Sequence, residues 1–371
     1  MKKILIFNSG AFIYGAERGL INLLRALDGK FNITVVLPSK GPLAGYLRQV
    51  YPSVRIIVFP LAVLVNSRSP LYLAKYCAFF LANIIYFALR VILSGTGLIM
   101  TNNLLLITPG IVARVCRRQH VWYVREFTGN DDIDRMLGAY VSRLSDAVIC
   151  QSNAIMDKLG LTGRAEVVYE PLNDADYYAL EPAEAKKILN IPADARVVSV
   201  VSRIHPSKGQ FEFIRDIKDV LKSREDLYLI LAGDITLNNV RDRQYKSDIA
   251  RLIKNEGLSR VRLLSFMDDV SPVFSASDIC VFPFRREEPF GIAVAEALAF
   301  GKETYYPRSG GLREVYGIFG EGHNYNIEAV EHALLRGGGS NEGKTALRVP
   351  DKLSYSRYKD AVWRILKKYF L

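Results

Sequence analysis

Residues 278–298 have the sequence DICVFPFRREEPFGIAVAEAL, and this stretch decides the fold class. Its first seven residues, Asp278–Phe284, form an apolar run that predicts a buried strand. Pro289 and Gly291 then mark a turn, and the Ala- and Leu-rich segment after them predicts a helix. A buried strand that leads through a turn into a helix is the repeating unit of a parallel sheet with helices on its faces.

The turn before this helix is suited to an oxygen-rich or anionic ligand. Glu288 lies in the turn and Glu296 on the second turn of the helix, while Phe290 and Gly291 place backbone N–H groups at the positive helix end. A carboxylate beside such a ligand is explained most simply if it accepts hydrogen bonds from hydroxyl groups, which sugars and ribose supply. The alternative for Glu288 is a helix-capping or solvent-facing role.

Two further segments follow predicted strands in the same part of the chain. Residues 201–209 read VSRIHPSKG, and residues 310–314 read GGLRE. Fixed cations in such a loop can bind an anionic ligand and stabilise developing negative charge without proton transfer. Arg203 can chelate two phosphate oxygens and Lys208 can act as a point charge, with solvated surface charge as the alternative for both.

Together these segments resemble those of the retaining, family 4 glycosyltransferases of the GT-B fold. Glu288 and Glu296 match the E-x7-E motif of that family. Residues 201–209 resemble its diphosphate-binding Arg…Lys-Gly segment, and residues 310–314 resemble its Gly-Gly-x-x-Glu segment. Each motif alone is a weak signal, whereas three in this order and spacing are a strong one.

The resemblance implies an α/β fold of two Rossmann-like, doubly wound domains that face each other across a cleft. We expect an acceptor-binding domain at residues 1–172, a linker at 173–195 and a nucleotide-sugar-binding domain at 196–352. The GT-B fold also implies that the last helix, predicted at Leu353–Leu371, returns to the first domain and completes it.

The resemblance also implies roles for individual residues. Arg203, Lys208 and Glu288 would be catalytic, with Glu288 binding donor-sugar hydroxyls and Glu296 binding the ribose. Further donor-binding candidates lie in loops of both domains, and the full donor-binding set is Gly15, Met267, Phe290, Gly291, Glu296 and Glu314. A plain turn glycine is the alternative for Gly15, a structural loop for Met267, and an anchor of the neighbouring glycine turn for Glu314.

In the first domain the sequence departs from the family. Family members often have a His near the loop after the strand His120–Val124, where this chain has Arg125 and Glu126. These two residues are our acceptor candidates, because an Arg can pair with an acceptor phosphate and a Glu can take its proton. An internal Arg–Glu ion pair is the alternative. A second departure is Glu303, where the family usually has Pro, which predicts an altered pocket floor or, alternatively, an unusual donor.

The charge of the chain is unevenly distributed. The net charge is +11, but residues 1–125 alone carry +13 and the remainder −2. This asymmetry predicts an anionic partner for the first half, and we expect a membrane surface. Nucleic acid is disfavoured, because the basic patches lack interleaved exposed aromatic residues.

The most hydrophobic segment, Tyr72–Leu93, is interrupted by Lys75, Asn83 and Arg90. A spanning helix, a buried core helix and a helix that dips into the membrane surface are the alternatives. Its aromatic and basic residues favour attachment to a membrane without crossing it. Scattered cysteines in apolar surroundings predict buried, reduced thiols and a cytosolic location, here on the inner face of the cell membrane: Cys77, Cys116, Cys150 and Cys280.

These patterns predict an enzyme that transfers a hexosyl or deoxyhexosyl group, with retention, from a nucleotide sugar to a lipid-linked or polysaccharide acceptor in cell-surface glycan synthesis, such as that of lipopolysaccharide. We expect no cofactor and no metal, because the sequence has no aspartate-rich metal motif and no Walker A or G-x-G-x-x-G fingerprint. A GT-B-type sugar-nucleotide epimerase or phosphorylase is one alternative. A non-catalytic protein that binds an anionic ligand is the other.

Overall fold

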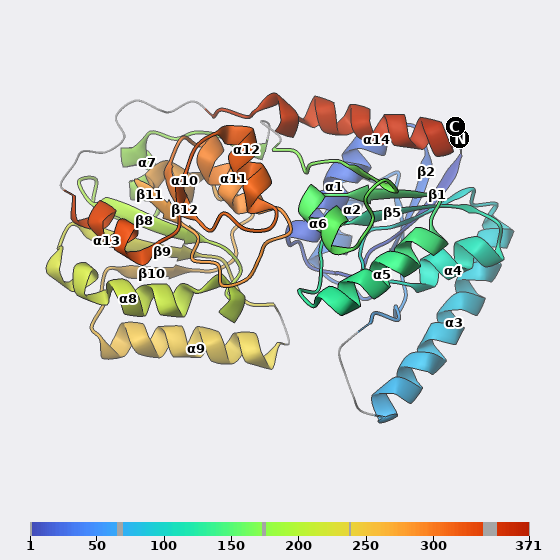
Figure 1. Ribbon diagram of the computed structural model, residues 1–371, viewed down its shortest axis with the longest axis horizontal. Helices are drawn as coiled ribbons and strands as arrows, with labels where there is room; N and C mark the ends of the chain where they lie inside the picture. Colours follow the sequence, from blue (N-terminus) through green and yellow to red (C-terminus); the bar gives the residue numbers. More distant parts are fainter. Residues whose placement is uncertain (1, 65–69, 173–175, 237–238, 337–346, 371) are drawn as a thin grey trace. The chain divides into compact units, whose positions relative to one another are not determined.

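The computed structural model describes residues 2–64, 70–172, 176–236, 239–336 and 347–370, and Figure 1 shows its secondary structure. The chain divides into two compact units. Unit 1 comprises Met1–Pro171 and Tyr355–Leu371, and unit 2 comprises Leu172–Ser354. The segment expected as a linker, 173–195, therefore groups with unit 2, and residues 173–175 of it lie outside the described residues.

Unit 1 is built on a seven-stranded parallel sheet with the order β3-β2-β1-β4-β5-β6-β7. Its central strands are buried on both faces, which explains why their sequences are continuous apolar runs. The strands are β1 (Lys3–Phe7), β2 (Asn32–Leu37), β3 (Arg55–Val58), β4 (Leu98–Thr101), β5 (Gln119–Val124), β6 (Ala147–Cys150) and β7 (Ala165–Val167). Its helices include α1 (Gly15–Leu27), α2 (Pro42–Val50), α3 (Pro70–Ser94), α4 (Thr108–Val115), α5 (Asp131–Leu144) and α6 (Asn153–Lys158).

The last helix, α14 (Tyr355–Tyr369), packs into unit 1 as the fold prediction required. Val362 and Ile365 are buried in the same core cluster as β1 and α1. The Trp363 ring stacks on Phe31 with 5.6 Å between ring centroids, and its indole N–H donates to the Ala26 carbonyl at 3.0 Å. The two ends of the chain thus share one hydrophobic core.

Unit 2 has a six-stranded parallel sheet with the order β10-β9-β8-β11-β12-β13. Helices α8, α9 and α13 contribute to the core cluster on one face, and Figure 1 shows α11 and α12 over the other. The strands are β8 (Arg196–Val201), β9 (Leu227–Ala232), β10 (Val261–Leu264), β11 (Ile279–Val281), β12 (Glu303–Tyr306) and β13 (His323–Asn324). The helices include α7 (Pro182–Ile188), α8 (Gln210–Ser223), α9 (Val240–Asn255), α10 (Ser271–Ala276), α11 (Ile292–Ala299), α12 (Leu312–Phe319) and α13 (Ile327–Leu335).

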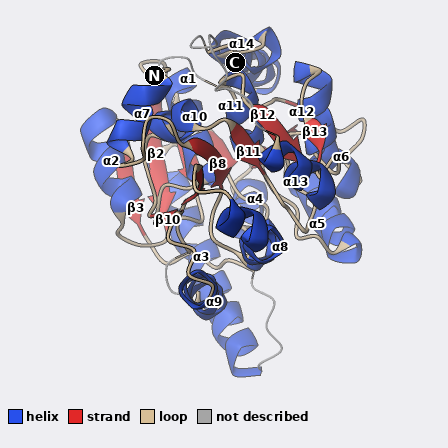
Figure 2. Ribbon diagram, turned by 90° about the vertical axis from the view of Figure 1, so that its left-hand side faces the viewer, coloured by secondary structure: helices blue, strands red, loops and turns tan. Residues whose placement is uncertain are grey.

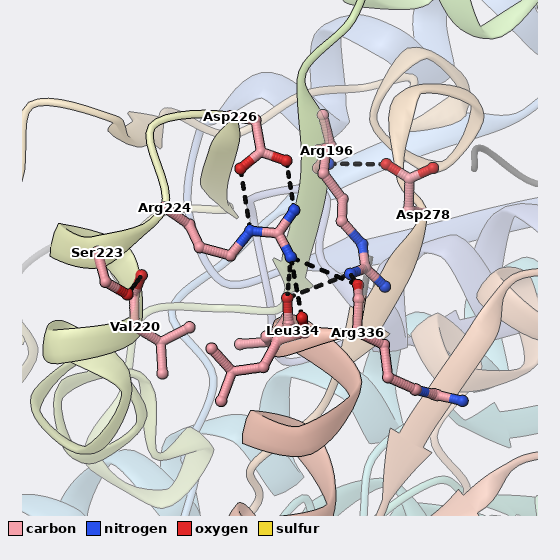
Figure 3. A network of polar contacts seen from close by, with 10 residues as sticks. Arg196, Val220, Ser223, Arg224, Asp226, Asp278, Leu334 and Arg336 are labelled. Carbon is pink, nitrogen blue, oxygen red and sulfur yellow. Dashed lines mark hydrogen bonds and ion pairs between the residues drawn. The ribbon is translucent and has the colours of Figure 1, made fainter. Parts of the chain in front are cut away.

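An arginine network closes the C-terminal end of α13 (Figure 3). Arg224 donates to the Leu334 carbonyl at 3.0 Å and forms an ion pair with Asp226. Arg196, the first residue of β8, donates to the same carbonyl at 3.1 Å. Helix ends leave carbonyls without intrahelical partners, so these guanidinium groups have a structural role at the amino-terminal edge of the sheet.

The structure excludes one of the three alternatives for the hydrophobic segment Tyr72–Leu93, the buried core helix. It extends from Pro70 to Ser94, and only 17% of its most apolar window is buried, so it is not a buried core helix. It is the one described helix long and apolar enough, by length and composition, to cross a membrane. The prediction of buried thiols is also corrected at Cys77, which is exposed on this helix.

Candidate functional site

The motifs of unit 2 meet at one edge of its sheet. Strands β8, β11 and β12 are neighbours in the parallel sheet, and each is followed at its carboxyl end by one of the predicted segments. These segments are residues 202–209, 282–291 and 307–311. Ligands of open α/β sheets bind at the carboxyl ends of the strands, so the topology makes this edge the candidate site.

Backbone contacts hold the three loops together. The Arg285 N–H donates to the Ser207 carbonyl at 2.9 Å, and the Gly311 N–H donates to the Glu288 carbonyl at 2.9 Å. Gly209 has a φ of +74°, and a Cβ there would lie 2.1 Å from the Pro283 carbonyl oxygen. The glycine of the Lys-Gly motif is therefore required, because a side chain would separate two of the loops.

Lys208 and Glu288, predicted from separate motifs, form an ion pair. The Lys208 Nζ lies 2.6 Å from the Glu288 Oε2, and the two side chains are 15% and 14% exposed. The same Nζ is 4.4 Å from the centroid of the Phe284 ring. A phosphate would compete with Glu288 for the ammonium, and a sugar hydroxyl would compete with Lys208 for the carboxylate. Their common position lets a single ligand with both groups satisfy both side chains.

Arg203 lies on the same loop and is exposed. Its guanidinium donates to the Thr236 hydroxyl at 3.0 Å. An exposed guanidinium that donates to a neutral hydroxyl can turn toward an anion at little cost. Arg203 is therefore placed in the loop that the resemblance assigns to the diphosphate.

His205, between Arg203 and Lys208, is a site residue that the sequence analysis missed. Its Nδ1 accepts a hydrogen bond from the Ser207 N–H at 3.0 Å, and its Nε2 lies 3.7 Å from the Asp242 carboxylate. Burial, reinforced by the positive charge of Arg203, lowers the pKa of His205. The neutral His205 ring thus holds the conformation of the loop through these contacts. Its position between the two cations was the available sequence signal.

The start of α11 is shaped by Gly291. This residue has a φ of +96°, and a Cβ there would lie 2.3 Å from the Leu312 Cδ2. The neighbouring Phe290 side chain is buried, so only its backbone can face a ligand. The prediction that Phe290 and Gly291 bind the donor through their backbone is compatible with this geometry and stays a prediction.

Glu296 is buried, and its partner comes from a distant part of the chain. The Tyr177 hydroxyl donates to the Glu296 Oε1 at 2.5 Å, and the Tyr177 ring packs edge-on against Phe300. Tyr177 belongs to the segment expected as a linker, and nothing local in the sequence identified it. If Glu296 binds ribose, the ribose must share or replace this hydroxyl.

Three further residues of unit 2 were singled out in the sequence: Glu314, Met267 and Glu303. Glu314 is partly buried on the first turn of α12, and Met267 is partly buried in the loop after β10. Glu303 is the first residue of β12, where it accepts hydrogen bonds from Tyr305 and Arg336. The prediction that Glu303 alters the pocket floor is therefore wrong, because Glu303 lies at the amino end of its strand.

Gly15 occupies the first position of α1 in unit 1. It is exposed, it has no positive φ, and a Cβ there would meet nothing within 4 Å. The chain conformation alone does not require a glycine here. Its role toward a donor phosphate stays a prediction.

Arg125 lies in the interior of unit 1. Its guanidinium forms an ion pair with Glu170, donates to the Asn102 side chain at 2.8 Å and donates to the Gly19 carbonyl at 3.0 Å. Burial alone would lower the pKa of Arg125, but the Glu170 carboxylate together with Tyr123 and Tyr358 outweighs burial and raises that pKa. The structure corresponds to the internal ion pair that was the alternative for Arg125, although the partner is Glu170 and not Glu126.

Glu126 is directed elsewhere. Its Oε1 accepts a hydrogen bond from the Leu104 N–H at 3.3 Å, and the residue is partly buried. Glu126 is thus the acceptor candidate with access to solvent, whereas the charge of Arg125 is enclosed. An acceptor phosphate could reach Arg125 only if its interior contacts opened.

A second polar cluster in unit 1 was not predicted. The Asn8 amide donates to the Glu17 carboxylate at 3.3 Å, and the Asn102 amide donates to the Asn8 side-chain oxygen at 2.8 Å. Burial raises the pKa of Glu17. A Cβ on Gly10 would lie 2.0 Å from the Glu17 carboxylate, so this glycine makes room for it. Asn8 and Asn102 directly follow β1 and β4, which was the available sequence signal.

Within the described ranges of the chain, no group of three or more His, Cys, Asp or Glu side chains is placed to hold a metal ion. The site as described therefore consists of cations, carboxylates and backbone at the carboxyl edge of unit 2, with a separate polar cluster at the carboxyl edge of unit 1.

Residues 182–331 match the family model of the group 1 glycosyl transferases. This confirms, for that part of the chain, the resemblance inferred from the motifs, while the assignment to family 4 stays a prediction. The matched residues include both Glu288 and Glu296 and both cations of the 201–209 loop.

Curated relatives match over part of the chain. A D-inositol 3-phosphate glycosyltransferase of Streptosporangium roseum is 25% identical over 205 residues, which cover 51% of this chain and 47% of the relative. A lipopolysaccharide 1,2-N-acetylglucosaminetransferase of Salmonella typhimurium is 25% identical over 143 residues, 38% of each chain. The matches thus span about half or less of the length of these relatives.

Solved structures match over the whole chain. Anabaena Alr3699/HepE, solved in complex with UDP and glucose, superposes with a TM-score of 0.77 at 19% identity and covers 99% of this chain and 100% of the other. A sucrose-phosphate synthase from Thermosynechococcus elongatus has a TM-score of 0.74 at 18% identity, with 100% and 99% coverage. Two parallel sheets with alternating helices and these neighbours confirm the predicted GT-B class of fold.

Proposed function

We propose that this chain transfers a hexosyl or deoxyhexosyl group from a nucleoside-diphosphate sugar to a lipid-linked or polysaccharide acceptor, with retention at the anomeric carbon. The observation that carries the proposal is the Lys208–Glu288 pair. It places a cation that can bind phosphate 2.6 Å from a carboxylate that can accept hydrogen bonds from hydroxyls. A nucleotide sugar has both complementary groups close together, because its diphosphate is bonded through oxygen to C1 of a sugar ring that carries hydroxyls.

Each side chain of the loop then has a defined task. Arg203 and Lys208 stabilise the negative charge that develops on the departing diphosphate, as fixed cations beside a developing anion do. Glu288 accepts hydrogen bonds from donor-sugar hydroxyls once Lys208 has turned to the phosphate. Glu296 accepts a hydrogen bond from the ribose in place of, or beside, the Tyr177 hydroxyl.

The relatives support a choice of first ligands and acceptors. UDP and glucose are bound in the Anabaena structure, so UDP-glucose is the first donor to test. One relative in Salmonella typhimurium acts on lipopolysaccharide, which supports a lipid-linked glycan as the first acceptor class. The cations of the donor loop supply the charge that a metal ion would, so we expect transfer to persist in the presence of a chelator.

Thermal shift against UDP, GDP and dTDP and their sugars tests the donor site. Wild-type protein should be stabilised by one nucleoside diphosphate, and further by its sugar. Lys208→Ala should lose most of the first shift, and Glu288→Gln only the further shift due to the sugar. Lys222→Ala is the matched control, because Lys222 also pairs with a carboxylate at 2.6 Å, that of Glu256, but lies outside the motif edge.

Transfer itself is tested by incubation of donor and acceptor, with the anomeric configuration of the product read by NMR. The expected product is a glycosylated acceptor that retains the donor configuration, in equal yield with and without chelator. Conversion of the nucleotide sugar into an isomer in the absence of any acceptor would contradict the proposal and favour an epimerase. No stabilisation by any nucleoside diphosphate would contradict the donor site.

A further inference from the structure

Helix α3 presents an apolar face to solvent. Its outward face consists of residues spaced three or four apart, so that they line one side of the helix: Ala78, Leu81, Ala82, Ile85, Leu89 and Ile92. All six are exposed, with Leu81 at 60%, Ile85 at 62% and Leu89 at 56%. Single exposed apolar residues are normal, but a continuous stripe of this length marks an interaction surface.

The opposite face of α3 is firmly anchored to unit 1. Phe87 is fully buried, with its ring centroid 4.7 Å from that of Phe7 and 5.2 Å from that of Phe59. The Asn83 amide donates to the Pro60 carbonyl at 3.1 Å and accepts from the Ala62 N–H at 3.3 Å. These contacts fix the orientation of the helix on unit 1, and the outward face is therefore held toward solvent.

The N-terminal turns of α3 extend past the other helices of unit 1 (Figure 1), and the helix is equally prominent in Figure 2. Leu71 is 67% exposed, and Phe79 is 51% exposed. Apolar surface thus continues from the outward face onto this projecting end. An apolar surface that extends along a helix and around its end can be covered completely by lipid chains, whereas a flat protein surface would cover only one side of it.

The charge around α3 indicates which kind of partner covers its apolar face. The sequence has no acidic residue between Asp28 and Glu126, so neither α3 nor the adjacent α4 carries a negative side chain. Lys75 and Arg90 are exposed on α3, and the Lys3 ammonium donates to the Ser94 carbonyl at 2.6 Å at its C-terminal end. A second copy of the chain would bring these cations against each other, whereas an anionic lipid surface would neutralise them.

We propose that α3 inserts its outward face into one leaflet of an anionic lipid bilayer and lies along the membrane surface without crossing it. Crossing would require the helix to leave its seat on unit 1, which would expose Phe87 and place the Asn83 amide and Arg90 in hydrocarbon. The proposal does not depend on sugar transfer, and it gives a lipid-linked acceptor a reason to be near unit 1.

Flotation of the full chain with vesicles tests the proposal without any turnover. The protein should float with vesicles of phosphatidylcholine and phosphatidylglycerol, and far less with phosphatidylcholine alone. The variant L81Q/I85Q/L89Q should lower the bound fraction about tenfold or more, because buried apolar area supplies most of the affinity of such a helix. The variant K75Q/R90Q should lower it less, and added salt should mimic that effect.

The matched control has three exposed apolar residues of unit 2 replaced in the same way, I188Q/V240Q/L335Q, at exposures of 52%, 71% and 54%. It should float like the wild type. Circular dichroism and the thermal shift with nucleoside diphosphate show that each variant is folded. Equal flotation of the α3 variant and the wild type would overturn the proposal. So would a wild-type dimer, seen by light scattering, that the α3 variant abolishes while neither protein binds vesicles.

A second measurement uses wild-type side chains. Cys77 is exposed on α3, whereas Cys116 is half-buried and Cys150 and Cys280 are buried, so a thiol-reactive fluorophore labels Cys77 first. Its emission should shift to the blue with anionic vesicles and be quenched more by lipids with shallow quenchers than by lipids with deep ones. No shift would show no insertion and would overturn the proposal.

Discussion

Both units place a cation and a carboxylate together at the carboxyl edge of a parallel sheet, but the two pairs differ in exposure. The side chains of Arg125 and Glu170 in unit 1 are each 4% exposed, whereas those of Lys208 and Glu288 in unit 2 are 15% and 14% exposed. A fully buried pair cannot open without leaving an uncompensated charge in the interior. A pair that water reaches can exchange its partner for a ligand. We therefore expect similar chemistry at the carboxyl edges of the two sheets to have a structural role in unit 1 and, on the proposed function, a binding role in unit 2.

The largest expected effect is the loss of the buried pair. Arg125→Met should lower the free energy of unfolding of unit 1 by about 3–5 kcal/mol, because Glu170 would remain buried and unpaired. Urea unfolding followed by tryptophan fluorescence measures this directly, since both tryptophans, Trp122 and Trp363, lie in unit 1. Arg114→Met, which breaks the exposed pair with Asp146, should cost less than about 1 kcal/mol. Equal losses in the two variants would remove the distinction between buried and exposed pairs.

The opposite behaviour is expected of the partly buried Lys208–Glu288 pair. Lys208→Ala should lower turnover by about 100- to 1000-fold, the usual loss when one group that stabilises developing negative charge is removed. Its effect on stability should stay below about 1 kcal/mol, because the pair is partly solvated. Steady-state kinetics and thermal unfolding of the same preparation, with Lys222→Ala as control, test this. Parallel loss of stability and turnover would make Lys208 a structural residue like Arg125.

The interior of unit 1 should also respond to pH. His120 is fully buried, with Nδ1 bonded to the Leu144 carbonyl at 2.7 Å and Nε2 to the Thr101 hydroxyl at 2.8 Å. Burial lowers the pKa of His120 to about 4. The unfolded chain therefore binds the extra proton first, and stability present above pH ~6.5 should fall by about 3 kcal/mol as the pH drops to 4.

The measurement is urea unfolding of the wild type and of His120→Gln between pH 7 and 4. Carboxylates titrate at the lower end of this range in both proteins, so the difference between the two curves isolates the histidine. The variant is expected to be less stable at pH 7 but less sensitive to acid. Parallel curves would show that His120 is not responsible for the loss.

The smallest expected effect concerns two glycines at the starts of helices, Gly291 before α11 and Gly15 in α1. Gly291→Ala should cost about 1–3 kcal/mol in unit 2 and weaken the thermal shift with nucleotide sugar, because its φ of +96° and the nearby Leu312 leave no room for a Cβ. Gly15→Ala should change stability by less than about 1 kcal/mol, since a Cβ there meets open space at the start of α1. A loss of donor binding in Gly15→Ala without loss of stability would reveal a functional role for Gly15.

Elements with strong local sequence signals were predicted correctly, whereas features that depend on residues distant in the sequence were not. The strand expected at His120–Val124 was observed as Gln119–Val124, and the strand and helix expected on either side of the turn at Pro289 and Gly291 were observed as β11 and α11, because apolar runs and turn residues are local signals. The strand Arg55–Val58 and the helix Pro42–Val50 were missed. β3 lies at the edge of the sheet and is only partly buried, so its sequence has a weaker apolar signal.

The candidate site shows the same division. The motifs that contain Arg203, Lys208 and Glu288 were visible because each is a short loop after a strand, and the order of strands in a parallel sheet brings such loops to one edge. The 2.6 Å contact between Lys208 and Glu288 was not predicted. The partner of Glu296 was not predicted either, since Tyr177 lies 119 residues away.

The sequence by itself determined the α/β class and the family resemblance of residues 201–315, because periodicity, turn chemistry and motif spacing are properties of contiguous residues. The return of the last helix was implied by that resemblance. Only the tertiary structure decided that Arg125 pairs with Glu170 in the interior and that α3 keeps an apolar face in solvent. The physical reason is that exposure and choice of partner depend on which distant segments pack nearby. An apolar helix has the same sequence pattern whether its second face is covered or bare.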